Sequence, residues 1–567
     1  MVNILNKIRT NWLNILIGFV IFWVLFSFLI YPNVNILFSA FTYNGKLSLR
    51  NLNMVLDSSR AIKGLFNSIL LAVTLSITVN IVGVFIVLVT EYFEIKGSKF
   101  LKLGFLSTLI YGGIVLVSGY IFSYGENGIL TKFIQNIFPN YNAGWFSGYL
   151  GVVFVMTFSV TSNHMIFLTN ALKKVDYHTI EAAQNLGEST FGILWKIVLP
   201  ILKPTIFAVT ILVFLTGLGA YAAPLLVGGR EFETLNPLIR ALVYDSPGIS
   251  IMLSVILGLL VIGLLITFTR IERKNTYYST SKTQARFKKQ KINNKYANII
   301  IHVLSYILCL IYILPIVLIV IFSFTDTNAI ASGTIRLDSF TLKNYIEVLG
   351  SPRILTPFFN SIRFSIVASI IVVFFVFFMI IIKFKSKLKA AGLIQYLLLI
   401  PWLLPSTVIA MGLIRTFNTS SILTLGAVLT GTTTILIIGY IIVKIPFTYR
   451  ILNAIYYTVD DSFENASKSL GAGKIYTFRK VTLPTVFPTI LALIAINFNS
   501  LITDYNLTVF LYHPLHRTLG IDIKNKTDLM AGGDVQAILL VYTVILMVFS
   551  SIVLYFAYGK LLKRVEI

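Results

Sequence analysis

The short motif that most suggests chemistry is GAGK at 471–474, because Gly-rich segments that end in Lys can cradle phosphate groups. A complete phosphate-binding loop needs another Gly five residues before the last Gly, and a Ser or Thr after the Lys. Lys468 and Ile475 occupy those two positions. The chain has no other Walker A pattern, no H-E-x-x-H, no nucleophile elbow and no paired carboxylates in an accessible segment. We therefore expect no enzyme activity, no ATP site and no metal or other cofactor in this chain.

A few polar side chains lie within long apolar runs, where they are costly to bury and are candidates for function. His164 could belong to a translocation path, although a hydrogen bond to a neighbouring helix explains it equally well. A second group lies near the end of a later run and could line an outer gate or form a structural hydrogen-bond network. This group consists of Asn497, Asn499, Asp504 and Tyr505.

The composition defines the class of protein. The chain has 567 residues, of which 56% are hydrophobic and only 12% are charged, and its mean hydropathy is +0.85. Soluble globular domains have about 25% charged residues, so the composition indicates an integral membrane protein. The formal net charge of +24 could suggest a nucleic-acid partner, but no basic segment carries a nucleic-acid-binding motif. The single cysteine, Cys309, excludes an internal disulfide and argues against a cysteine-based metal site.

Apolar stretches long enough to span a bilayer need about 20 residues. They lie near 11–31, 67–90, 103–123, 148–170, 203–225, 249–270, 298–323, 361–382, 391–413, 423–444, 485–508 and 535–558. The sequence therefore predicts an all-α integral membrane fold of about 12 transmembrane helices. The first stretch is too long for the core of a signal peptide and is interpreted as a retained span.

The distribution of Lys and Arg predicts the orientation. With a cytoplasmic N-terminus, about two thirds of these residues fall on the cytoplasmic side, as the positive-inside rule requires. The largest basic cluster is 270–295, between the sixth and seventh spans. We interpret 271–297 as a cytoplasmic linker and expect both termini to be cytoplasmic.

The segments that could position a functional site each occur twice in the chain. EAAQNLGESTFGILWKIVLPILKP at 181–204 returns 284 positions later as NASKSLGAGKIYTFRKVTLPTVFP at 465–488, with the Gly, Leu-Pro and second Pro at identical spacing. Another pair, 49–69 and 342–362, matches at an offset of 293 and shares the string FNSI. The chain is therefore predicted to be a tandem duplication. We assign 1–270 to a first module and 298–567 to a second.

The repeated polar segment resembles the EAA motif of ABC importer permeases. The first copy fits through Glu181, Ala182, Ala183, Gly187, Ile197, Leu199 and Pro200. The second copy is degenerate: Asn465 replaces the glutamate, Glu464 stands one place early, and Ser467 replaces the second alanine. It retains Ala466, Gly471, Leu483 and Pro484. The resemblance extends over nearly the whole chain, because the number and order of the spans also agree with a fused, two-module type I permease.

The resemblance implies partners and a mechanism. Each EAA loop, about 170–200 and about 453–484, would bind one nucleotide-binding subunit, so that two ATPase subunits carry the ATP and Mg. An extracytoplasmic binding protein would deliver the substrate, and alternating access would pass it through the bacterial cytoplasmic membrane. A secondary transporter is the alternative from another class, but it would need no EAA loops.

The residues of the first loop predict its local structure. Residues 170–186 can form a helix, and Gly187 can adopt the left-handed conformation that ends it. We expect a short second helix to follow and Pro200 to begin the next span. An ordinary interhelical loop is the plainer alternative, but its duplication with Gly and Pro spacing intact favours a coupling helix.

The substrate is indicated less directly. YAAPLLVGG at 221–229 and TDYNLTVFLYHPLHRTLGIDI at 503–523 are similar to segments of ferric iron permeases, although Asp504 stands where a glutamate is usual. We therefore expect ferric iron. Phosphonate, polyamine, thiamine and sulfate remain alternatives within the same class.

Overall fold

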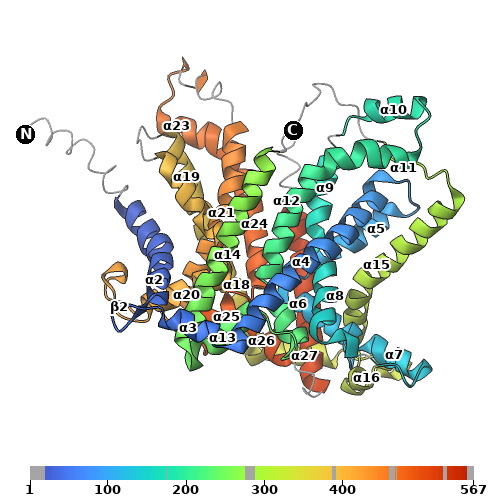
Figure 1. The fold of residues 1–567 in the computed structure, drawn as a ribbon, viewed down its shortest axis with the longest axis horizontal. Coiled ribbons are helices and arrows are strands. Elements are labelled where there is room, and N and C mark those ends of the chain that lie inside the picture. Colours follow the sequence, from blue (N-terminus) through green and yellow to red (C-terminus); the bar gives the residue numbers. More distant parts are fainter. Residues whose placement is uncertain are drawn as a thin grey trace, which may run out of the picture.

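The computed structural model describes residues 19–142, 144–173, 175–274, 288–385, 391–458, 466–467, 469–527 and 533–557. Nearly all regular structure in these ranges is helical, and Figure 1 shows an upright bundle of long helices. One hairpin, β1 (Thr42–Tyr43) with β2 (Lys46–Leu47), is antiparallel. The predicted all-α membrane fold is confirmed.

The helices of the first half are, in chain order, η1 (Phe26–Ile30), α2 (Tyr31–Ala40), α3 (Arg50–Leu56), α4 (Ser59–Val87), η2 (Leu88–Tyr92), α5 (Ser98–Leu106), η3 (Ser107–Leu109), α6 (Gly113–Tyr124), α7 (Ile129–Ile137), η4 (Gly144–Phe146), α8 (Gly148–Val160), α9 (Ser162–Leu172), α10 (Tyr177–Asn185), α11 (Thr190–Ile193), η5 (Leu194–Val198), α12 (Leu199–Leu218), η6 (Pro224–Gly228), α13 (Leu235–Asp245) and α14 (Pro247–Lys274).

Those of the second half are α15 (Lys295–Ser323), α16 (Thr327–Ser332), η7 (Leu337–Ser339), α17 (Lys343–Gly350), α18 (Pro352–Lys385), α19 (Ala391–Leu399), η8 (Ile400–Leu403), α20 (Ser406–Phe417), η9 (Ile422–Thr424), α21 (Thr433–Thr458), α23 (Lys474–Thr477), η10 (Phe478–Thr482), α24 (Leu483–Ile502), α25 (Thr508–Leu511), α26 (Leu519–Lys526) and α27 (Gly533–Leu554).

The described residues contain 10 helices long and apolar enough to cross a membrane, or up to 12 if each of two bent pairs is one span. The two bent pairs replace the predicted straight spans 103–123 and 391–413. The first bends by 116° between Leu109 and Gly113, and the second by 106° between Leu403 and Ser406. Backbone chemistry explains both breaks. Gly113 has a positive φ of 61°, which glycine tolerates, and Leu404 is extended because it precedes Pro405.

The internal repeat is confirmed by the element boundaries. The run α11, η5, α12 recurs as α23, η10, α24 with every boundary displaced by 284 residues. The starts of α3 and α4 recur as those of α17 and α18, displaced by 293. Each π-turn, η5 and η10, stands directly before a helix with Pro at its second position. Sequence duplication has therefore kept local irregularities as well as helices.

The repeated FNSI string has a structural role. Ser68 Oγ accepts a hydrogen bond from Leu235 N at 2.8 Å, and Ser361 Oγ accepts one from Leu519 N at 2.7 Å. The preceding asparagine of each string, Asn67 or Asn360, donates to a backbone carbonyl two residues before that leucine. The two serines thereby satisfy the first amides of α13 and α26, which would otherwise lack partners.

The first helix of each half packs on the other half. Helix α2 packs against α20, and α15 packs against α5 and α6. Polar contacts reinforce the exchange, since Asn35 Nδ2 donates to Thr416 Oγ1 at 3.0 Å and Lys132 Nζ donates to Ala331 O at 2.6 Å. The two modules are therefore interlocked and share their apolar packing.

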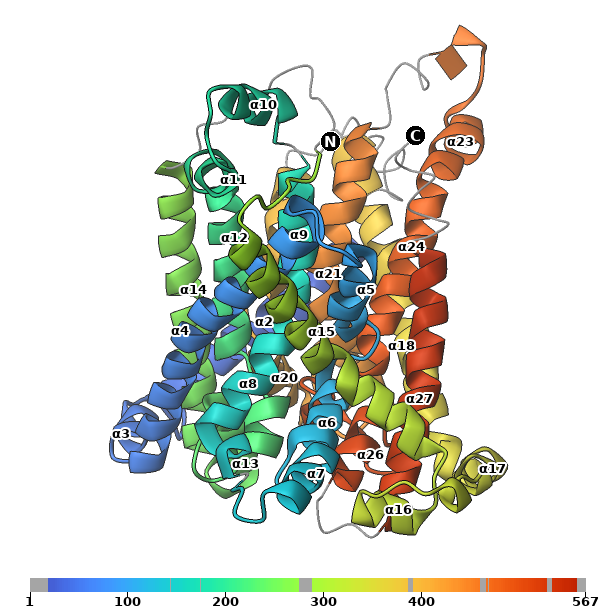
Figure 2. The ribbon, with the colours of Figure 1, turned by 90° about the vertical axis from the view of Figure 1, so that its right-hand side faces the viewer.

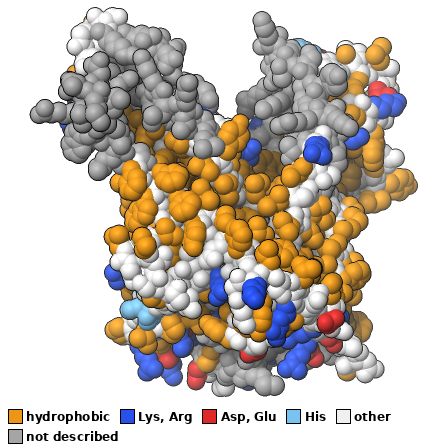
Figure 3. Space-filling view, turned by 60° about the vertical axis from the view of Figure 1, so that its left-hand side comes forward, with side chains coloured by type: hydrophobic (Ala, Val, Ile, Leu, Met, Phe, Trp, Pro, Cys, Tyr) orange, Lys and Arg blue, Asp and Glu red, His pale blue; other side chains and the backbone are white. Residues whose placement is uncertain are grey.

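Both repeated loops lie at the same end of the bundle. Figure 1 shows α10 and α23 near the top, whereas α3, α13, α16 and α26 lie near the bottom, and Figure 2 shows the same from the side. We call these the loop end and the opposite end. Figure 3 shows hydrophobic side chains over the middle of one face, with charged side chains toward both ends and most of the visible Lys and Arg near the opposite end. That banding suits a chain held in a bilayer.

Candidate functional site

The first loop is built around the short helix α10. Asp176 caps it by accepting a hydrogen bond from His178 N at 3.1 Å, and Ile180 anchors it in the core with 0% exposure. The predicted continuous helix over 170–186 is wrong, because α9 ends at Leu172 and α10 begins at Tyr177. An extended, capping Asp176 starts a new helix. The break sets α10 apart from the bundle at the loop end, as Figure 2 shows.

Gly187 ends this helix as predicted. Its φ is +83°, in the left-handed region, and Gly471 in the second loop has a φ of +78°. The hydrogen bonds around the two glycines correspond pair by pair. Leu186 N donates to Ala182 O and Glu188 N to Ala183 O, while Leu470 N donates to Ala466 O and Ala472 N to Ser467 O. These are helix-ending bonds that satisfy the last carbonyls. Glu464 and Asn465 lie outside the described residues.

An exposed leucine stands before each glycine. Leu186 is 88% exposed and Leu470 is 87% exposed. An isolated exposed leucine is ordinary, but these two occupy equivalent positions of the duplicated loop. Sequence reasoning did not select this leucine as a site residue. The sequence signal that could have found it is an identical large apolar residue at the same position of both polar segments.

The remaining residues of the first motif are also placed at the loop end. Glu181 and Ala182 are exposed, with the Glu181 side chain 54% accessible and 3.7 Å from His178 Nδ1. Ala183 is half-buried and packs on the core. Leu199 and Pro200 open α12, as Leu483 and Pro484 open α24.

Pro200 does not begin the span, which corrects the prediction. The membrane-spanning helix runs continuously from Thr190 to Leu218, and Pro200 lies inside it. The π-turn η5 ends immediately before Leu199. This wider turn accommodates Pro200, which has no amide N–H to donate to the preceding turn. Pro484 follows η10 in the same way.

The two loops differ in how they are braced. In the first, Lys196 Nζ donates to Glu188 Oε2 at 2.6 Å. This contact holds the pKa of the Glu188 carboxyl below its usual value. The equivalent of Glu188 in the second loop is Ala472, so that loop lacks the ion pair. Instead, Ser467 and Thr477 join their hydroxyl groups at 2.8 Å, where the first loop has Ala183 and Ile193.

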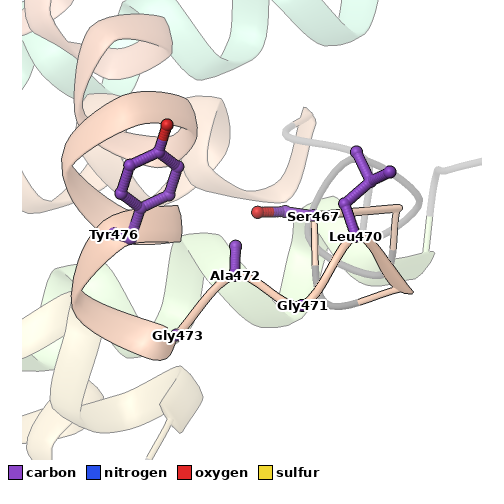
Figure 4. Close-up of a pocket in the computed structure, with 6 residues that line it drawn as sticks. All are labelled: Ser467, Leu470, Gly471, Ala472, Gly473 and Tyr476. Carbon is purple, nitrogen blue, oxygen red and sulfur yellow. The ribbon is translucent and has the colours of Figure 1, made fainter.

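The second loop also encloses a small hollow. Figure 4 shows its lining around the turn that leads into α23. The lining residues are Ser467, Leu470, Gly471, Ala472, Gly473 and Tyr476. The hollow is therefore part of the surface that carries the exposed Leu470, and its lining presents apolar and hydroxyl groups.

His164, the first candidate for a translocation path, lies between packed helices. It is fully buried in α9, and its Nε2 is 2.9 Å from Asn80 Oδ1 of α4. A Cβ at Gly83 would come within 2.4 Å of the His164 ring, so the two helices are in close contact there. This hydrogen bond to a neighbouring helix is one of the two explanations that the sequence allowed for His164.

The other candidates gather at the end of α24. The sequence predicted a span over 485–508, which would include Asp504. The helix α24 instead ends at Ile502, so Asp504 lies just beyond it. Its carboxylate accepts hydrogen bonds from Leu507 N, Thr508 N and Thr508 Oγ1, which begin α25. Tyr505 is 4% exposed and contacts Tyr221 of the first module. This brings Asp504 and Tyr505 to the interface between modules.

Asn497 and Asn499 lie within α24. Asn497 is 1% exposed and donates to Thr448 Oγ1 of α21 at 2.9 Å. The Oδ1 atom of each asparagine is buried without a hydrogen-bond partner among the described residues. Within the same part of the chain, no group of three or more His, Cys, Asp or Glu could hold a metal ion.

This fold is that of a transport permease: two interlocked helical modules that carry duplicated, exposed loops at one end. The chain matches the family described as "Binding-protein-dependent transport system inner membrane component" over residues 103–276 and again over 380–567. It therefore belongs to that family, as a fused, two-module ABC importer permease. The sequence resemblance is confirmed.

Comparison with individual proteins agrees with this class. The chain is 35% identical to the "Probable ABC transporter permease protein y4fN" of Sinorhizobium fredii, over 96% of this chain and 95% of that protein. It is 21% identical to the "Ferric transport system permease protein FbpB" of Actinobacillus pleuropneumoniae, over 94% of this chain and 76% of that protein. It is also 22% identical to the "Sulfate transport system permease protein CysT" of Salmonella typhimurium, over 36% of this chain and 70% of that protein.

Proposed function

We propose that this chain is the complete membrane pathway of an ATP-driven importer and moves ferric iron from an extracytoplasmic binding protein to the cytoplasm. The observation that carries the proposal is the pair of equivalent loops at one end, each with a left-handed glycine preceded by an exposed leucine. Two such loops on one chain would seat two ATPase subunits. Membership in the family sets aside the secondary transporter.

The loop end would face the cytoplasm, together with both termini, and the opposite end would receive the binding protein. The basic residues of the linker support this orientation through the positive-inside rule. ATP and Mg would be bound by the partner subunits. Closure of those subunits would move α10 and its counterpart, and the long helices that continue from α11 and α23 would carry that movement through the membrane.

The number of subunits can be measured directly. We expect native mass measurement of the detergent-purified complex to give one copy of this chain with two ATPase subunits. The purified chain alone should hydrolyse no ATP, and hydrolysis should begin when the ATPase subunit is added. A complex with two copies of this chain, or vanadate-sensitive turnover by the chain alone, would contradict the proposal.

Ferric iron is supported by similarity to the ferric permease over nearly the whole of this chain. Deletion of the gene should slow uptake of radiolabelled ferric iron under iron limitation, and expression of the chain should restore it. Sulfate is the second candidate, because a shorter stretch is similar to a sulfate permease. Unchanged iron uptake with loss of sulfate or phosphonate uptake would transfer the assignment to that substrate.

A further inference from the structure

The end of the linker between the modules is bound to the first module. Gln290 N donates to Tyr92 O at 2.8 Å, and Glu94 N donates to Gln290 O at 2.9 Å, so that Phe93 and Gln290 form a parallel β-bridge. Gln290 is 3% exposed. Gln290 is therefore part of the packed structure of the protein, although it lies within the predicted linker 271–297.

The same linker segment contacts the first loop. The side-chain amides of Gln184, in α10, and Gln290 are joined by a hydrogen bond. Thr190 Oγ1 donates to Lys291 O at 2.9 Å at the start of α11. The ammonium group of Lys288 lies 5.4 Å from the centre of the Tyr177 ring. Contacts therefore reach the beginning, the middle and the end of the loop.

Lys289 binds the linker segment to two membrane-embedded parts of the first module. Lys289 Nζ donates to Thr90 O at 2.6 Å and to Ser98 Oγ at 2.8 Å. Thr90 belongs to the last turn of the span that begins with α4, and Ser98 begins α5. Each hydrogen bond from a charged donor contributes more than a neutral one. The segment is thus held on both the loop and the membrane helices of the first module.

On its other side the segment leads straight into the second half. Asn294 caps α15 by accepting hydrogen bonds from Tyr296 N and Ala297 N, both at 3.0 Å. Farther along, Tyr306 OH donates to Lys96 O at 2.8 Å, which ties α15 to the turn before α5. A continuous path of hydrogen bonds and covalent chain therefore joins α10 to the first helix of the other module.

We propose that residues 288–292, here named the strap, position the first coupling loop and connect its movement to α15. This inference rests on the proposed coupling function of the loop. The strap holds Gln184 and Thr190 against η2, the turn that follows α4, so that α10 and the strap move as one body. Movement of a partner ATPase at the first loop then acts on helices of both modules, because α15 belongs to the second half and packs on the first.

The test compares Gln290→Ala with Lys291→Ala. The first variant removes the side-chain bond to Gln184, and its backbone bridge can still form. The second is a matched control, because the Lys291 side chain is exposed and the strap uses only its backbone carbonyl. Hydrogen exchange on the full-length chain in detergent should be roughly tenfold faster over 177–193 in Gln290→Ala. It should be unchanged over 469–477 and in Lys291→Ala.

The functional measurement is substrate transported per ATP hydrolysed by the reconstituted complex. We expect this ratio to fall severalfold in Gln290→Ala and to stay at the wild-type value in Lys291→Ala. A wild-type rate of hydrogen exchange over 177–193 in Gln290→Ala would overturn the proposal. Faster exchange with an unchanged amount of substrate transported per ATP hydrolysed would also overturn it. If the wild-type chain stimulates no ATPase at all, the proposed function fails instead, and the two failures are thereby distinguished.

A crosslink provides a second test, in which a covalent link replaces the hydrogen bond between the strap and α10. Cys309 is the only cysteine, so Cys309→Ala gives a background for Gln184→Cys with Gln290→Cys. Before crosslinking, this protein lacks the Gln184–Gln290 bond and should resemble Gln290→Ala. Because the strap and α10 move together, joining the two thiols with a reducible bifunctional thiol reagent should raise the transport per ATP hydrolysed toward the wild-type ratio. Transport that stops on crosslinking and returns on reduction would show that the strap separates from the loop during the cycle, and would overturn the proposal.

Discussion

Tyr221 and Tyr505 occupy equivalent positions of the internal repeat and pack edge to face, with ring centroids 5.5 Å apart. Both are almost fully buried, at 3% and 4% exposure. Each lies three residues beyond the end of its long helix, α12 or α24. Equivalent residues of two halves meet only where a two-fold axis passes between them. The tyrosine pair therefore marks the pseudo-two-fold axis and closes the modules together at the end away from the loops.

A substrate that crosses between the modules must separate this pair. We predict that Tyr221→Cys with Tyr505→Cys, in the Cys309→Ala background, will crosslink with a reducible bifunctional thiol reagent and lose transport. Reduction should restore transport, and each single-cysteine variant should be insensitive to the reagent. Uptake by reconstituted vesicles is the measurement. Wild-type uptake by the fully crosslinked protein would show that this contact does not open during transport.

The two loop glycines give a prediction that depends on the backbone alone. A Cβ at Gly187 or Gly471 would meet nothing within 4 Å, so any cost of substitution comes from the left-handed conformation. That cost is roughly 1–2 kcal/mol for an ordinary residue. Gly187→Val and Gly471→Val should therefore insert normally but transport slowly, because their exposed leucines are reoriented. We expect Gly187→Val to be the more damaging, since the first loop keeps the full motif.

Gly263, in α14 and away from both loops, supplies the control for these variants. It also has open space around a Cβ, but its φ is not positive. Gly263→Val should therefore transport at the wild-type rate. The measurement is uptake divided by the quantified membrane level of each variant. Normal uptake by both valine variants would mean that the loops do not couple the ATPase to the membrane helices.

The features that sequence reasoning could predict are those fixed by local chemistry. Gly187 and Gly471 end helices because a left-handed residue is needed there, and the FNSI strings recur because the same amides need the same partners. The breaks before Gly113 and Pro405 were missed, since hydropathy counts apolar residues without regard to direction. The Tyr221–Tyr505 contact and the strap could not be predicted either, because each depends on which distant segments meet.

The ion pair of the first loop predicts a pH dependence that the second loop lacks. Lys196 lowers the pKa of Glu188 below the ordinary value of 4.5. The stabilising contact is therefore complete above about pH 4.5 and is lost as the pH falls through the lower pKa of the folded state. Protection of 177–193 from hydrogen exchange, corrected for the intrinsic rate at each pH, should fall in acid. Protection of 469–477 should not change over the same range.

The variant Glu188→Gln tests the cause. It keeps the shape of the side chain and removes its titration, so the acid-dependent loss of protection should disappear. Its protection at neutral pH should already be lower than that of the wild-type chain. A loss of protection in acid that persists in Glu188→Gln would assign the effect to another group.

The opposite end carries a further difference between the modules. Arg60 forms two hydrogen bonds of 2.7 Å with the Glu233 carboxylate. The equivalent positions of the second module hold Arg353 and Arg517, and the structure shows no ion pair for either among the described residues. The backbone is the same at both places, because Asn67 and Asn360 make equivalent bonds to the carbonyls of Glu233 and Arg517.

We therefore predict that Arg517→Glu will create in the second module the ion pair that the first already has. The gain in unfolding free energy should be at most about 1 kcal/mol, because the Arg60 side chain of the existing pair is 58% exposed and solvent weakens such pairs. A double-mutant cycle with Arg353→Ala, followed by thermal unfolding in detergent, isolates the interaction. The gain should vanish when Arg353 is absent. An equal gain with and without Arg353 would show that removing a positive charge, and not forming a pair, stabilises this end of the molecule.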